Sequence, residues 1–101
     1  MTTMDDQLKE AVERLHECRA ELARSVPVRE VFGGDMVWEG LVSVFDLAGN
    51  KSAKQAFAWS SPIEGSTKRR FFAVLQIPPI NTPVDAVRAA IVQEHRTGKS
   101  T

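Results

Sequence analysis

The longest β-rich run of the chain lies at residues 36–47, which read MVWEGLVSVFDL. β-branched and aromatic residues are frequent in this run, and they favour a pleated strand whose successive side chains point to opposite faces. One predicted face carries Trp38, Val42 and Val44, and the other carries Val37, Leu41, Phe45 and Leu47. Because both faces are apolar, we expect this strand to lie centrally in a sheet, or to have its second face covered by another chain.

Three further strands are predicted, at residues 28–32, 53–60 and 69–77. The segments between them are rich in Gly, Asn, Ser and Pro, which favour turns. Residues 53–60 alternate between large and small side chains: Gln55, Phe57 and Trp59 share one face, and Ala56 and Ala58 share the other. The small face predicts close packing of a helix against this strand.

A helix is predicted before the strands. Its apolar residues follow at steps of four and three, which places them on one helical stripe: Met4, Leu8, Ala11, Leu15, Cys18 and Leu22. Pro27 restricts the residue before it to extended geometry, so we expect this helix to end near Arg24.

A second helix is predicted after the strands. It begins with Thr82 as N-cap, Pro83 at the first helical position and Asp85 three residues after the cap. We expect it to run to about Glu94 or His95, with one buried stripe formed by Val84, Val87 and Ile91.

These elements predict a single α+β domain over residues 1–101, with about 97–101 as a frayed tail. The expected architecture is a four-stranded, mainly antiparallel sheet with both helices packed on one face, in the order helix, four strands, helix. Two helices on one face leave a surplus of apolar side chains for the other face: Trp38, Val42, Val44, Phe72 and Val74.

Composition excludes several classes of protein. A chain of 101 residues is long enough for one core and too short for a multi-domain enzyme. The lone Cys18 forms no intrachain disulfide, which excludes a secreted disulfide scaffold. The acidic N-terminus lacks the apolar stretch of a secretory signal, and no run approaches 18 apolar residues. We therefore expect a cytoplasmic protein that does not enter the membrane.

The net charge of zero conceals a segregation of charge. Thirteen Lys and Arg balance thirteen Asp and Glu, but residues 1–50 carry a net −5 and residues 51–101 a net +5. The basic side chains of the second half lie in two groups: Lys51 with Lys54, and Lys68 with Arg69 and Arg70. Antiparallel strands would separate the two groups by roughly 20 Å, so they are not expected to form one patch.

No arrangement typical of catalysis or metal binding is found in the sequence. His16 and Cys18 lie about 200° apart on a helix and cannot share a metal ion, and Glu13 with His16 is a single pair without a second one. Glu39 and Asp46 are an odd number of residues apart on one strand, so they point to opposite faces. We expect no enzymatic activity, no cofactor and no metal.

Three functions remain open. The first is a non-enzymatic binding or assembly module, acting as a homodimer or on a protein partner. Its interface would come from the surplus sheet face or the first helix: Met4, Leu8, Leu15, Leu22, Trp38, Val42, Val44 and Phe72.

The second is a small-molecule-binding protein with an apolar pocket between sheet and helices, lined by Trp38, Glu39, Gln55, Phe57 and Trp59. The third, and least favoured, is weak nucleic-acid binding through Lys68, Arg69 and Arg70.

Overall fold

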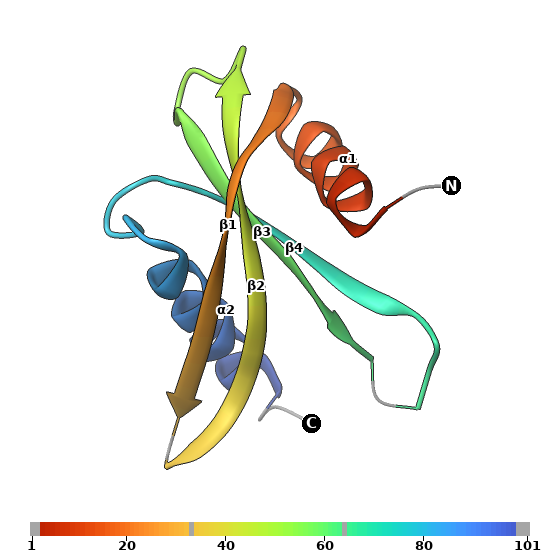
Figure 1. Cartoon of the computed structure of the whole chain (residues 1–101). Coiled ribbons are helices and arrows are strands. Elements are labelled where there is room, and N and C mark those ends of the chain that lie inside the picture. The colour runs from red at the N-terminus through yellow and green to blue at the C-terminus, as the bar shows by residue number, and fades with distance from the viewer. Residues whose placement is uncertain (1–2, 33, 64, 99–101) are drawn as a thin grey trace.

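The computed structural model describes residues 3–32, 34–63 and 65–98. The elements are α1 (Met4–His16), β1 (Arg19–Phe32), β2 (Asp35–Ala48), β3 (Gln55–Pro62), β4 (Arg69–Leu75) and α2 (Pro83–Gly98). The strands form one antiparallel sheet in the order β1-β2-β3-β4 (Figure 1). The predicted α+β class and the order of the elements are confirmed. Within the described residues, no helix is both long enough and apolar enough to cross a membrane.

The prediction that both helices share one face is wrong, because α1 and α2 lie on opposite sides of the sheet (Figure 1). The core on the α1 side consists of Leu8, Val12, Ala20, Phe45, Ala56 and Ala58. The core on the α2 side consists of Val28, Val42, Val44, Phe57, Trp59, Ala86 and Val87. The physical reason is that the central strands are apolar on both faces, and each helix covers one of them. The surplus face expected from the sequence is therefore buried under α2.

The predicted alternation of side chains holds along the central strands. On β2, Val42 and Val44 face α2 while Phe45 faces α1. On β3, the small Ala56 and Ala58 have no exposed surface and pack in the same cluster as Leu8 and Val12 of α1. The small face of β3 thus receives a helix, as its sequence predicts.

α1 ends at His16, eight residues before the predicted end near Arg24. Glu17 adopts a left-handed conformation with φ of 50°, and the Glu13 carboxylate accepts a hydrogen bond from the Ala20 N–H at 2.9 Å. The chain then enters the 14-residue β1, of which the predicted strand at 28–32 is the end, and Leu22 pairs with Phe45 rather than extending the helical stripe. Pairing along the whole of β2 outweighs the local helical pattern.

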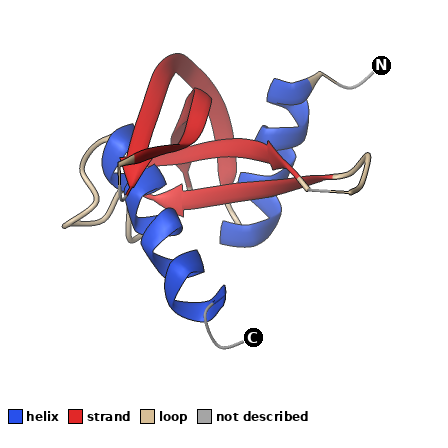
Figure 2. Ribbon diagram, turned by 90° about the horizontal axis from the view of Figure 1, so that it is seen from below, coloured by secondary structure: helices blue, strands red, loops and turns tan. Residues whose placement is uncertain are grey.

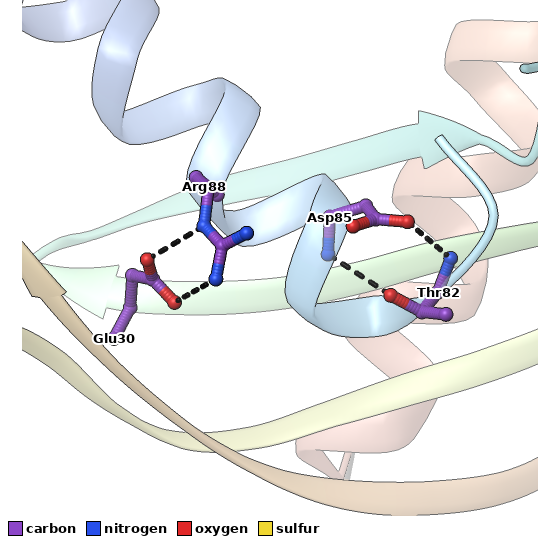
Figure 3. Close-up of polar contacts among 4 residues, drawn as sticks. All are labelled: Glu30, Thr82, Asp85 and Arg88. Carbon is purple, nitrogen blue, oxygen red and sulfur yellow. Dashed lines mark hydrogen bonds and ion pairs between the residues drawn. The ribbon is translucent and has the colours of Figure 1, made fainter. Parts of the chain in front are cut away.

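α2 begins as its sequence predicts. The Thr82 hydroxyl accepts a hydrogen bond from the Asp85 N–H at 3.2 Å, and the Asp85 carboxylate accepts from the Thr82 N–H at 3.1 Å (Figure 3). Val87 is buried, and Val84 and Ile91 pack at the edge of the same core.

The C-terminal end of α2 differs from the prediction. The helix continues past Glu94 and His95 to Gly98, so residues 97 and 98 of the predicted frayed tail are helical. Residues 99–101 of that tail lie outside the described residues.

An ion pair joins α2 to β1. Glu30 on β1 is 7% exposed, and Arg88 of α2 donates hydrogen bonds to its two carboxylate oxygens, from Nε at 2.9 Å and from Nη2 at 3.5 Å (Figure 3). This contact raises the pKa of Arg88. Since a buried carboxylate without a partner is costly, the pair fixes where along β1 the helix lies.

The cap of α2 predicts a pH dependence of stability. The Asn81 N–H, and then the Thr82 side chain and N–H, hold the pKa of Asp85 below its ordinary value. The ionised carboxylate therefore stabilises the fold above its unfolded-state pKa, and this contribution is lost as pH falls through the lower folded-state pKa. We expect urea midpoints of Asp85→Asn to lie below those of the native chain at pH 7, and the difference to shrink progressively as pH falls below about 4. A difference that is unchanged at pH 3 would contradict this role.

Candidate functional site

The two β-hairpins of the sheet are joined over a short distance. β2 pairs with β3 at residues 43–46 and 55–58, whereas β1 pairs with β2 and β3 with β4 over nearly their full lengths. Beyond this junction the β1–β2 hairpin and the β3–β4 hairpin run in different directions (Figures 1 and 2). The sheet is consequently split between β2 and β3.

A groove of about 690 Å³ lies at the split, within the size range of ligand sites. We call it the inter-hairpin groove, and its lining residues come from α1 and from three strands: Met4, Leu8, Trp38, Glu39, Gly40, Leu41, Ser60, Ser61, Pro62 and Arg69. If pairing continued in register, Leu41 would face Ser60 and Glu39 would face Pro62. The groove therefore occupies the place of the missing rungs of the ladder.

The groove side of β2 continues past the end of its ladder with β3. Leu47 N–H donates to the Lys54 carbonyl at 2.8 Å, so this is a hydrogen-bonded pair of the β2–β3 ladder. Backbone groups of an antiparallel strand face the same neighbour at every second residue, so those of Leu41 and Glu39 also face β3. At both residues the pairing with β3 has ended, since the last pair of the β2–β3 ladder on this side is Ser43 with Ala58.

The β3 side of the groove is closed to further pairing. Pro62 has no N–H to donate. The Ser60 carbonyl, which would have accepted from Leu41, instead accepts from Arg69 Nη2 at 3.3 Å, and the Ser60 hydroxyl accepts from Arg69 Nε at 2.9 Å. Arg69 thus replaces β2 as the partner of Ser60.

A row of aromatic rings spans the split on the α2 side. The rings of Trp59 and Phe72 stack with centroids 5.0 Å apart, and Trp38 lies 6.2 Å from Trp59 at an angle of 57°. Trp38 lies over Gly40, where an added Cβ would come within 2.9 Å of the indole. The missing side chain of Gly40 therefore leaves the space that the ring of Trp38 occupies.

Charge in the groove is arranged at its two walls. Arg69 donates to two neutral oxygens of Ser60, and among the described residues it has no carboxylate partner. Glu39 on the opposite wall lies 4.0 Å from Arg29 of β1. The β4 wall is thus the cationic side of an otherwise largely apolar groove.

The predicted pocket residues are only partly brought together. Trp38 and Glu39 line the groove, as the small-molecule hypothesis requires. Phe57 and Trp59 are buried in the core under α2 and do not line the groove, and Gln55 donates to Asp46 at 2.8 Å outside it. The five residues therefore do not line one pocket in this arrangement, and the small-molecule site stays a prediction for Trp38 and Glu39.

Half of the groove residues are candidates in the sequence, although for different sites: Met4, Leu8, Trp38, Glu39 and Arg69. Gly40, Ser60 and Ser61 join the site because of the strand register, which sequence patterns do not determine. Two signals were available: a proline at the end of a strand, and a glycine two residues after a tryptophan on one face.

The predicted dimer interface is divided between core and surface. Leu8, Val42 and Val44 are buried, and Trp38 and Phe72 pack half-buried against the α2 core. The exposed members are Met4, Leu15 and Leu22. The apolar sheet face that suggested a dimer is thus covered within one chain.

The three cationic residues proposed for nucleic acid do not share one face. Arg69 reaches Ser60 on the α1 side, whereas the Arg70 guanidinium lies 5.1 Å from the ring of Phe72 on the α2 side. Lys68 precedes β4 and is exposed. Neighbouring residues of a strand point to opposite faces, so this cluster forms no continuous phosphate-binding surface.

The side chains considered for metal binding make structural contacts. A ring nitrogen of His16 lies 3.0 Å from the Ala73 carbonyl, and Glu13 binds the Ala20 N–H. Cys18 is a half-buried free thiol. Across residues 3–32, 34–63 and 65–98, no group of three or more His, Cys, Asp or Glu side chains could hold a metal ion.

Comparison of the chain with models of protein families, with curated proteins and with solved structures finds no match in any of the three.

The end of the β2–β3 ladder predicts that amide hydrogen exchange is faster at Leu41 than at Ser43. The Ser43 amide lies in the paired region, whereas the Leu41 amide faces the groove without a strand partner. We expect Leu41 to exchange on the order of 100-fold faster than Ser43 at pH 7 and 25 °C. Equal protection of the two amides would show that β2 and β3 remain paired at Leu41.

Gly40→Ala tests whether the ring of Trp38 needs the space that the missing side chain of Gly40 leaves. The added methyl group clashes with the indole and should destabilise the fold by about 1–3 kcal/mol in urea denaturation. The clash disappears in a Trp38→Ala background, so Gly40→Ala should lower the free energy of unfolding much less there. Equal costs in both backgrounds would mean that Gly40 is needed for another reason.

Proposed function

We propose that this protein is a small non-enzymatic binding module and that the inter-hairpin groove is its ligand site. The observation that supports it best is the interrupted ladder: two strands that pair in register separate and leave a lined groove at the point of separation. A sheet that served only as a scaffold would gain hydrogen bonds by closing the split.

The lining predicts the kind of ligand. Met4, Leu8, Trp38 and Leu41 offer apolar surface, and Leu41 is 62% exposed. Arg69 adds one cation without a carboxylate partner among the described residues. A ligand that combines an apolar body with one anionic group fits this surface.

The homodimer stays a prediction, and its support moves to another surface. Leu15 and Phe71 are exposed and line a second, smaller hollow between α1 and β4. β4 is an edge strand of the sheet, and an exposed apolar edge is where two copies of a chain commonly pair.

An apolar anionic dye tests the groove without knowledge of the natural ligand. We expect 8-anilinonaphthalene-1-sulfonate to bind saturably, and Leu41→Asp to weaken binding at least about five-fold, since it places a like charge in the groove. Met4→Asp, at the other wall, should act in the same direction.

Val31→Asp is the matched control, because Val31 is a similarly exposed apolar residue on β1 that does not line the groove. Circular dichroism checks that each variant is folded. Dye binding that Leu41→Asp and Met4→Asp leave unchanged, or that Val31→Asp weakens equally, would contradict the groove as the site.

A further inference from the structure

The backbone of β2 indicates what kind of molecule the groove receives. Leu41 and Glu39 each direct one N–H donor and one carbonyl acceptor toward the split. Donors and acceptors that alternate along a strand edge match the backbone of another extended chain, and small molecules rarely reproduce this spacing. On these grounds, and resting on the proposed function, we infer that the groove binds an extended peptide segment as an added strand on β2.

Each outer edge of the sheet carries one position that interrupts strand addition, and no such position is found at Glu39 or Leu41. Pro27 is the β1 residue that pairs with Leu41. Because the backbone groups of Leu41 point to the groove, those of Pro27 point to the outer edge of β1, and Pro27 has no N–H to offer there. The Gln76 N–H, just after β4, donates to the Gln55 carbonyl, so its backbone groups point toward β3. Ala73 lies three residues earlier, so its backbone groups point to the outer edge, where a ring nitrogen of His16 lies 3.0 Å from its carbonyl oxygen. Proteins block edges in these ways to prevent unwanted strand addition.

The length of the groove limits the segment. The groove follows residues 39–41 of β2, and at 3.3 Å per residue this accommodates about three to five residues of an extended chain. The side chains of that segment alternate between the two sides of the sheet. On one side they meet Met4 and Leu41, and on the other they meet Trp38 over Gly40.

Charge sets the preferred residue of the segment. Arg69 lies on the β3–β4 wall, where it donates to two neutral oxygens of Ser60 and has no carboxylate partner among the described residues. An acidic side chain that points to the α1 side reaches this guanidinium, whereas Glu39 on the β2 wall disfavours acid there. The partner is therefore an extended segment of another protein that carries one acidic side chain facing Arg69.

The test uses the acetylated, amidated peptide Ac-TVEVT-NH2 as probe and amide chemical shifts of the labelled protein as readout. We expect saturable shifts centred on Glu39 and Leu41, with slowed exchange of the Leu41 amide. The analogue Ac-TVKVT-NH2 should bind about three-fold more weakly. Arg69→Gln should remove this preference, and Arg24→Gln, an exposed arginine on β1 outside the groove, should preserve it.

N-methylation of the probe separates strand addition from side-chain recognition. The methylated peptide keeps every side chain but loses its amide donors, and we expect at least about ten-fold weaker binding. Equal binding of the methylated peptide would overturn strand addition while leaving the groove as a site. Dye binding without peptide binding would likewise overturn strand addition while leaving the groove as a site. Shifts at Leu41 that depend on protein concentration alone would overturn the peptide partner, because they would show that a second copy of the chain pairs with this part of β2. Absence of both dye and peptide binding would overturn the proposed function as well.

Discussion

The four residue pairs that join β2 to β3 are the constraint on which the rest of the structure depends. Val44 and Phe57 meet on one side of this junction, and Phe45 meets Ala56 on the other. The largest fully buried side chains, Phe45 and Phe57, belong to it. Because both faces are buried here, a shift of register by one residue would exchange the two cores, so the junction fixes the positions of α1, α2 and both hairpins.

The fold could be predicted from the sequence wherever local chemistry decides it. The cap at Thr82 and the alternation along β2 required only neighbouring residues. The end of α1 could not be predicted in this way, since Leu22 continues the helical stripe yet pairs with Phe45 through contacts distant in sequence. The placement of the helices followed from an incomplete argument: two apolar faces and two helices require one helix on each face, and the sequence contained both facts.

The candidate site was harder to predict than the fold. Trp38 and Glu39 stood out by residue type, but a groove exists only because pairing stops after Ser43 and Ala58. Arg69 was noticed as one of three cations, and its contact with Ser60 depends on the β3–β4 register that brings Pro62 beside it. The same register explains why the basic cluster fails as a patch, since it sends Arg69 and Arg70 to opposite sides of the sheet.

In the groove, backbone hydrogen bonds and side-chain contacts contribute differently to the free energy of binding. Glu39 and Leu41 are exposed residues, so a hydrogen bond from their backbone to an added strand would replace one to solvent and contribute only about 0.5–1.5 kcal/mol. Four such bonds fall short of, or barely offset, the association cost of about 4 kcal/mol or more. Affinity must therefore come from apolar contact with Met4, Trp38 and Leu41, at roughly 25 cal/mol per Å² buried. The ladder fixes the position of the segment and excludes ligands without a backbone, and Arg69 then favours an acidic residue at one point along it.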